Sequence, residues 1–224
     1  TIGPNAATAA NFITSTVLGG QGNDNFVIGT VSGSRVNGNK DTDNILSANT
    51  VTSTLFGGQG NDTVNSTASA TSLVSGDLGD DQVIIGTGDQ TSSTFSGGDG
   101  NDRITLNTGA AAANVFTSNT INGGAGSDVI NDAAGGRTQT GIVVNGDAGI
   151  DNVNLARIAA SVTIDGGDDG DIITSGLAGD VVTGGAGNDN ITNTGGAAGA
   201  AIGDTITGGT GADTIATAAN DTAE

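Results

Sequence analysis

The sequence predicts an all-β fold in which short strands stack along one axis as a solenoid. Three observations favour this class: a nine-residue unit recurs twelve times, every unit carries a large apolar residue, and bulky core residues are scarce. Among 224 residues, 41 are glycine and the only aromatic residues are five phenylalanines, while Trp, Tyr, Met, Cys and His are absent. A stack of short coils buries a narrow apolar row without bulky side chains, so this composition suits a solenoid better than an ordinary globular domain.

Two positions of the unit are kept throughout, as in the segment GGQGNDNFV that begins at Gly19. The units begin at Gly19, Gly38, Gly57, Gly76, Gly97, Gly123, Gly146, Gly166, Ser175, Gly184, Gly199 and Gly208. The sixth position is always aspartate: Asp24, Asp43, Asp62, Asp81, Asp102, Asp128, Asp151, Asp171, Asp180, Asp189, Asp204 and Asp213. The eighth position is always a large apolar residue: Phe26, Ile45, Val64, Val83, Ile104, Ile130, Val153, Ile173, Val182, Ile191, Ile206 and Ile215.

The residues around each unit predict a strand, a turn and a second strand. An apolar residue stands two positions before every unit, apart from the small Ala197: Val17, Val36, Leu55, Val74, Phe95, Ile121, Val144, Ile164, Ile173, Val182 and Ile206. Alternation of such residues with polar ones is typical of strands. At the second position glycine is replaced only by Asn39, Asp77, Asp147 and Ala200. Because Asn and Asp tolerate a left-handed backbone better than other residues, we expect positive φ at this position.

The charge of the chain is concentrated in aspartate. The formal net charge is −19, and it comes from 23 Asp and one Glu against five basic residues. A solvated acidic surface would use Glu as well, whereas a short carboxylate beside a turning backbone favours Asp, so this bias indicates metal ligation. The basic residues are too few for a nucleic-acid partner to be expected: Arg35, Lys40, Arg103, Arg137 and Arg157.

The chemistry of the unit favours calcium. Ca²⁺ takes six to eight oxygen ligands in loose geometry, and a glycine-rich turn frees backbone carbonyls to point at an ion. The unit offers no His, Cys or Glu for zinc or other transition metals. The alternative is that each aspartate only caps its own turn. Twelve carboxylates stacked in register would repel one another without cations, which favours calcium.

The unit resembles the calcium-binding nonapeptide GGxGxDxUx of RTX proteins, the hemolysin-type calcium-binding repeat family, over residues 19–217. The chain is most similar to bacterial surface-layer or cell-surface members of that family. The resemblance implies a parallel β-roll, a β-solenoid of about ten to eleven coils with Ca²⁺ between stacked turns. It implies that the ligands are the twelve aspartates named above and turn carbonyls, including those of Gly19, Gly57, Gly76, Gly97, Gly123, Gly146, Gly166, Gly184 and Gly208.

The spacing of the units predicts two different edges. Successive units begin 19, 19, 19, 21, 26, 23, 20, 9, 9, 15 and 9 residues apart. A coil of about 18 residues has two turns, so most coils carry the motif on one edge only. Ten units, all except those that begin at Ser175 and Gly199, are expected on that edge. The units at Ser175 and Gly199 are expected on the other edge. Nine gaps on the first edge and one on the second predict about ten Ca²⁺ ions.

We expect three regions and one set of insertions. Residues 1–18 form an entry coil or cap, 19–217 the calcium-binding solenoid and 218–224 a truncated further turn. The extra residues at 109–113, 135–141 and 193–198 are expected to form loops on the edge without calcium. No apolar run approaches the roughly 20 residues that span a membrane, so membrane insertion is not expected.

The function expected from these features is that of a calcium-binding, extracellular structural module of a bacterial surface layer, fibril or similar cell-surface assembly. The RTX resemblance implies type I secretion and folding outside the cell, and calcium neutralisation predicts self-association into a lattice or fibril. The alternative is a calcium-dependent secretion and folding module of a larger exoenzyme, toxin or adhesin. A cell-surface polysaccharide is a further candidate partner, but no Trp or Tyr offers a platform for a sugar. Enzyme activity is not expected, because no His or Cys is present to act as base or nucleophile.

Overall fold

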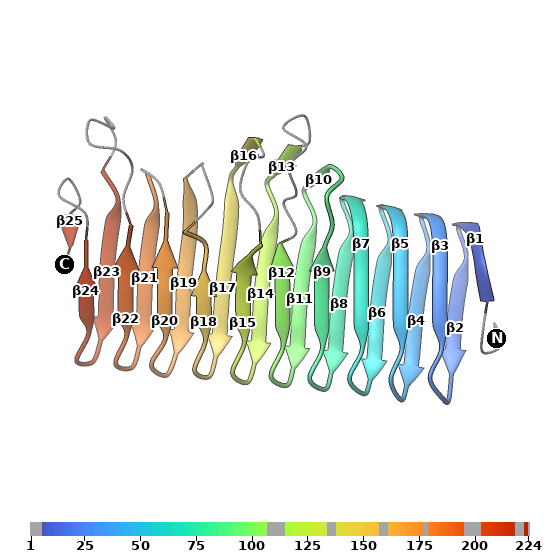
Figure 1. The fold of residues 1–224 in the computed structure, drawn as a ribbon, viewed down its shortest axis with the longest axis horizontal. Helices are drawn as coiled ribbons and strands as arrows, with labels where there is room; N and C mark the ends of the chain where they lie inside the picture. The colour runs from blue at the N-terminus through green and yellow to red at the C-terminus, as the bar shows by residue number, and fades with distance from the viewer. Residues whose placement is uncertain are drawn as a thin grey trace.

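The computed structural model describes residues 6–106, 115–133, 138–156, 161–176, 179–194, 203–217 and 222–223. These residues form strands, turns and bends but no helix. The strands stack side by side along the long axis of the molecule, from the N-terminus at one end to the C-terminus at the other (Figure 1). The predicted parallel β-solenoid is confirmed.

Two parallel sheets make the two faces of the stack. The order in sheet A is β1 (Ala6–Ile13), β3 (Asn25–Ser32), β5 (Asn44–Val51), β7 (Thr63–Ala70), β9 (Gln82–Ile85), β12 (Arg103–Leu106), β15 (Val129–Asp132), β18 (Asn152–Asn154), β20 (Ile172–Ser175), β22 (Asn190–Asn193) and β24 (Thr214–Ala216). The order in sheet B is β2 (Thr16–Gly20), β4 (Arg35–Lys40), β6 (Thr54–Gln59), β8 (Leu73–Leu78), β11 (Thr94–Asp99), β14 (Thr120–Ala125), β17 (Ile142–Ala148), β19 (Val162–Asp168), β21 (Val181–Ala186), β23 (Thr205–Thr210) and β25 (Thr222–Ala223).

The chain alternates between the sheets through two kinds of turn. Turns that lead from a sheet B strand into the next sheet A strand contain the aspartate motif, and we call this side the motif edge. Turns that lead from sheet A back to sheet B form the opposite edge. In Figure 1 the motif edge is the lower side, where the turns form an even row.

Equivalent motif positions lie beside one another from coil to coil. In sheet A, Phe26 pairs with Ile45 and Ile45 with Val64. In sheet B, Val17 pairs with Val36 and Val36 with Leu55. The register is therefore set by the unit itself, because a slip of one residue would turn every apolar side chain to solvent.

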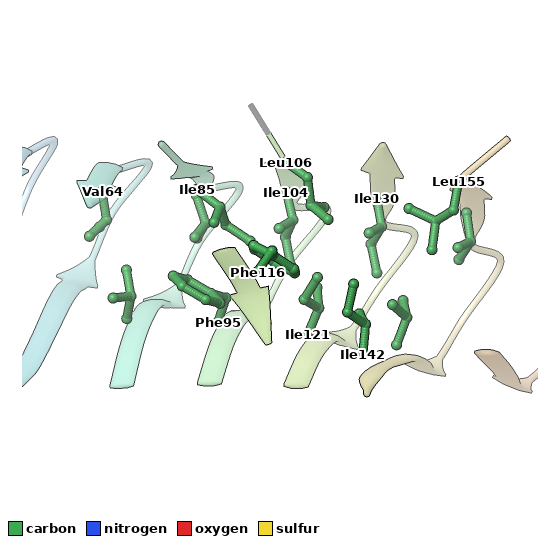
Figure 2. Packing of buried hydrophobic residues seen from close by; sticks show 14 of the residues in the cluster. Val64, Ile85, Phe95, Ile104, Leu106, Phe116, Ile121, Ile130, Ile142 and Leu155 are labelled. Carbon is green, nitrogen blue, oxygen red and sulfur yellow. The ribbon is translucent and has the colours of Figure 1, made fainter. Parts of the chain in front are cut away.

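The core is built around two apolar rows that face each other between the sheets, and buried residues outside these rows, such as Ile85, Leu106 and Phe116, complete it (Figure 2). One row holds the eighth-position residues of the motif edge and the other the residues two positions before those units. Both predicted rows are buried, and Figure 2 shows Val64, Ile104 and Ile130 of the first row across from Phe95 and Ile121 of the second. Ile215 is only partly buried. Each coil thus contributes little apolar area, so the stack depends on polar contacts at its edges.

The irregular spacings add residues after sheet A strands. Strand β7 is continuous, but its counterparts in the next coils are split, and short strands resume its second half: β10 (Gln90–Thr91), β13 (Val115–Thr117) and β16 (Thr138–Thr140). Of the expected loops, 109–113 lies outside the described residues, and 193–198 is described only to residue 194. In 135–141, residues 138–140 are strand β16 rather than loop, because they pair with β13 and continue the sheet.

Candidate functional site

The motif turns use left-handed backbone at their second and fourth positions. At the second position, φ is +81° at Asn39, +82° at Asp77 and +76° at Asp147, as expected from the Gly, Asn and Asp preference. Ala200, which also replaces glycine, lies outside the described residues. The fourth position is equally left-handed, including at Asp41 (+72°) and Asp169 (+69°). The units with these replacements therefore keep the turn of the others.

The sixth-position aspartates of the motif edge cap the backbone of the preceding coil. In the nine members that follow Asp24, one carboxylate oxygen, Oδ1, accepts a hydrogen bond from the backbone N–H of the preceding aspartate, at 2.7–3.0 Å. We call this row the aspartate ladder: Asp24, Asp43, Asp62, Asp81, Asp102, Asp128, Asp151, Asp171, Asp189 and Asp213. The bonds run between coils, so the aspartate is neither a free surface acid nor a cap of its own turn only.

The second oxygen of these carboxylates has no partner. Oδ2 is buried without a hydrogen bond in nine members of the ladder: Asp24, Asp43, Asp62, Asp81, Asp102, Asp128, Asp151, Asp171 and Asp189. An ionised oxygen buried without a donor is costly, and native proteins pair such atoms or bind a cation there. The same cost recurs in nine successive coils, which makes a common partner the simplest physical solution.

For eight of these nine carboxylates, a backbone carbonyl of the next coil lies at the same first-position glycine as Oδ2. A Cβ built on Gly97 would lie within 3.0 Å of both Asp102 Oδ2 and the carbonyl oxygen of Gly123, the first residue of the next unit. The same pair of oxygens flanks most first-position glycines: Gly19, Gly38, Gly57, Gly123, Gly146, Gly166 and Gly184. Gly97 is also skipped between Ser96 and Gly98 in the pairing of β11 with both neighbours. The first glycine is thus required for space, and a carboxylate and a carbonyl converge above it.

Burial raises the pKa of seven ladder carboxylates, those of Asp43, Asp62, Asp81, Asp102, Asp128, Asp151 and Asp171. Desolvation is the largest cause, and neighbouring carboxylates add to it, while the N–H from the preceding coil acts in the other direction. The pKa rises from 3.8 to about 7 at Asp81 and Asp151, and to about 6 at Asp43, Asp102 and Asp171. These shifts are the energetic sign of charges that lack a counter-charge.

The residues present fit calcium. Eight of the nine gaps between coils supply both a carboxylate oxygen without a donor and a first-position carbonyl, and both are the hard oxygen ligands that Ca²⁺ prefers. Among the described residues no three acidic side chains gather at one point, so a site combines carboxylates with turn carbonyls. The sequence-predicted aspartates and first-position glycines of the motif edge are therefore brought together in pairs.

Asp180 and Asp204 lie on the opposite edge, as the spacing predicts, but in a different setting. Asp204 Oδ1 accepts hydrogen bonds from the N–H groups of Asp180 (2.7 Å) and Gly179 (2.5 Å). Its Oδ2 accepts one from Asn193 Nδ2 at 2.7 Å. Asp180 Oδ1 accepts from the N–H of Val162 at 3.0 Å. Both oxygens of Asp204 are thus satisfied by protein donors, unlike those of the aspartate ladder.

The opposite edge carries a second row that the sequence reasoning missed. We call it the serine ladder: Ser15, Ser34, Ser53, Ser72, Ser93 and Asn119. Ser53 Oγ accepts from the N–H of Ser34 at 3.1 Å and donates to the carbonyl of Val51 at 2.7 Å. The other serines donate in the same way to a carbonyl two residues earlier. The signal was present, because each member precedes an apolar row residue by two positions.

Comparison with known proteins adds no identification. No family model, no curated protein and no solved structure matches the chain. In the described part of the chain, no helix is long and apolar enough to cross a membrane.

Proposed function

We propose that the chain is a calcium-binding structural module whose folding depends on Ca²⁺ bound along the motif edge. The observation that carries the proposal is the row of nine buried Oδ2 atoms without a hydrogen-bond donor. A cation between successive turns supplies the missing partner for each oxygen and offsets the repulsion between neighbouring carboxylates. Binding energy then becomes folding energy, because the sites exist only when the coils are stacked.

The stoichiometry follows from the two edges. Ten motif-edge turns leave nine gaps, and in eight of them a ladder carboxylate oxygen and a carbonyl of the next coil lie at the same first-position glycine. Nine Ca²⁺ ions are therefore expected on the motif edge. A tenth, on the opposite edge, is expected to bind most weakly, because both carboxylate oxygens of Asp204 already accept hydrogen bonds from protein donors. Nine ions carry +18 against the formal −19, which leaves the folded chain near neutrality.

The role that suits such a chain is mechanical rather than catalytic. Its strands are linked along one axis by parallel hydrogen bonding, and its pockets are shallow surface grooves. Calcium is abundant outside cells, so an extracellular module of a surface layer, fibril or similar cell-surface assembly would fold where it is needed. The RTX resemblance of the repeat supports the same location and role.

Circular dichroism in chelator and in calcium tests the proposal. The chain should lack β-structure in excess chelator and gain it in millimolar Ca²⁺, while Mg²⁺ substitutes poorly because it demands a smaller octahedral site. Equilibrium dialysis should find about nine to ten ions per chain. A β-type spectrum that is unchanged by chelator, or only two or three bound ions, would refute the proposal.

Two isosteric variants locate the ions. Asp102→Asn and Asp99→Asn remove the same charge from one turn, but Asp102 Oδ2 is buried and Asp99 is an exposed residue at the end of β11. Asp102→Asn should lower the number of tightly bound ions and the stability in calcium, and Asp99→Asn should change neither appreciably. Equal losses in the two variants would contradict the ladder as the binding site.

A further inference from the structure

The outer face of sheet B carries its charge unevenly along the stack. Its only basic residues, in the strands that the structure describes, are Arg35 and Lys40 at the two ends of β4, and both are exposed. We call them the basic patch. Five and six strands further along, β17 and β19 present Asp147, Asp165 and Asp168, all exposed, while the strands in between carry single aspartates, Asp77 on β8 and Asp99 on β11. We call these the acidic patch.

The acidic patch lines a hollow, and the basic patch presents a guanidinium. Asp147, Asp165 and Asp168 line a surface groove of about 470 Å³ together with Asn145, Ala148 and Gly167. The Arg35 guanidinium stacks on the Phe56 ring of β6, 4.8 Å from the ring centre. A planar guanidinium is the group best matched to a pair of carboxylates.

We propose that the outer face of sheet B is the contact surface between two copies of this chain, packed with their long axes antiparallel. In this arrangement the basic patch of each copy meets the acidic patch of the other, so both charge contacts form at once. A two-fold axis near β11, midway between β4 and β19 in the sheet, relates the copies. The proposal rests on the proposed function, because calcium must first neutralise the ladder before two acidic chains approach.

Two exposed apolar residues of this face lie inside the footprint, Leu78 on β8 and Val143 on β17, while Leu18 on β2 and Val181 on β21 lie beyond its two ends. Leu78 is 45% exposed and Val143 is 36% exposed, and contact with a second copy would remove both from water. With strands about 4.8 Å apart and about 3.3 Å per residue, seven strands bury roughly 1,200 Å² in total, at the low end of specific interfaces. The dimer should therefore be weak, in the micromolar range, and sensitive to salt.

Charge reversal tests the contact. In millimolar Ca²⁺, sedimentation velocity should show dimerisation of the wild type. Arg35→Glu and Asp165→Arg should each raise the dissociation constant about tenfold or more, and 0.5 M NaCl should also weaken the dimer. An equimolar mixture of the two variants should restore it, because each reversed charge then faces its complement on both sides of the two-fold axis.

A matched control and a separate readout make the outcome decisive. Arg103→Glu makes the same charge change at an exposed residue of β12 in sheet A, on the other face of the stack. It should change the dissociation constant less than twofold. A wild-type chain that stays monomeric, equal effects of Arg35→Glu and Arg103→Glu, or a mixture that fails to associate would each overturn the interface. Circular dichroism and ion counts on the same samples report calcium-dependent folding separately, so failure of the proposed function would be recognised as such.

Discussion

The two edges of the solenoid solve the same problem with different side chains. On both, an oxygen from one coil accepts a hydrogen bond from a backbone N–H of the preceding coil. Ser53 on the opposite edge accepts from Ser34 and donates its own hydrogen to Val51. Asp62 on the motif edge accepts from Asp43, but its other oxygen has no donor. A hydroxyl closes its own hydrogen-bond set, whereas a carboxylate needs a proton or a cation from outside.

Under the proposed function, this difference places calcium dependence on one side of the fold. The opposite edge holds its turns with protein atoms alone, and Asp204 continues that solution through Asn193. The motif edge leaves one oxygen per coil unsatisfied, so it is complete only with a ligand. A chain built this way has a permanent edge and a conditional edge, and the conditional edge decides when the whole stack forms.

The largest expected effect comes from protonating the motif edge. A neutral aspartic acid gains an O–H donor and resembles serine, so acid should partly replace calcium. The folded-state pKa values of about 6 to 7 lie above the unfolded value of 3.8. The penalty for charging these groups is therefore absent below pH 3.8 and grows as pH rises through 6 to 7.

In chelator, the chain should gain β-structure on titration from pH 8 to pH 5, and the apparent calcium affinity should rise with pH over the same range. Circular dichroism and calcium titration at several pH values measure both effects. The opposite edge contains no titratable group in its serine ladder, so Ser53→Ala should leave the number of protons taken up in the pH transition unchanged, while its lower stability moves the midpoint to lower pH. A calcium-free chain that loses β-structure on acidification would contradict the linkage.

A smaller effect is expected from filling the space beneath one carboxylate. A Cβ at Gly97 would lie within 3.0 Å of Asp102 Oδ2 and of the Gly123 carbonyl, so Gly97→Ala should displace both oxygens. We expect a loss of about 2–4 kcal/mol in calcium and weaker ion binding. Gly22→Ala is the control, because its Cβ meets nothing within 4 Å and only its φ of +90° is strained. That change should cost about 1 kcal/mol without altering ion number. Calorimetry with equilibrium dialysis separates the two.

The apolar rows and motif turns could be predicted from the sequence because their residues are strict. An aspartate followed two residues later by Val or Ile predicts both a turn and a buried strand position. Asn39 and Asp77, which replace glycine at the second position of the unit, indicated a positive φ at that position. The assignment of Asp180 and Asp204 to the other edge followed from equal 24-residue spacings. Such features are visible because one physical demand acts on the same position in every coil.

The polar parts of the fold could not be predicted in the same way. Ser47, Thr50 and Ser66 are fully buried. Their hydroxyl groups tolerate burial because they hydrogen-bond to one another, with Thr50 Oγ1 3.1 Å from Ser47 Oγ and 2.9 Å from Ser66 Oγ. Small polar residues ordinarily signal solvent, and only the pairing of coils shows that they satisfy one another. The unpartnered aspartate oxygens were equally invisible, since they depend on which direction each carboxylate faces.

A loss of stability smaller than that of Gly97→Ala is expected from removing one serine of the opposite edge. Ser53→Ala deletes the hydrogen bonds to the Ser34 N–H and to the Val51 carbonyl, and leaves both buried or partly buried groups without that partner. The loss should be about 1–2 kcal/mol in calcium. Because the aspartate ladder, and not the serine ladder, is the proposed ion site, calcium affinity per site should stay unchanged in dialysis. A fall in ion number for Ser53→Ala would show that the edges are coupled rather than separate.

The smallest expected effect is a gain in stability at a strained turn of the same edge. Thr52 has a φ of +49°, a left-handed conformation that is unfavourable for a β-branched residue. Its N–H still donates to the carbonyl of Ala70 at 2.9 Å, a bond that glycine keeps. The chain already uses Gly33, with φ of +56°, at the equivalent turn of the preceding coil. Thr52→Gly should therefore stabilise the calcium-bound chain by about 0.5–1 kcal/mol, after the extra unfolded-state freedom of glycine is counted.

The reciprocal change, Gly33→Ala, should destabilise by about 1 kcal/mol, because its Cβ would meet only Thr14 Cγ2 at an ordinary 3.5 Å and the cost is purely conformational. Calorimetric melting of both variants in saturating calcium decides the point: a lower melting temperature for Thr52→Gly would mean that the threonine side chain stabilises the turn more than its backbone strain weakens it.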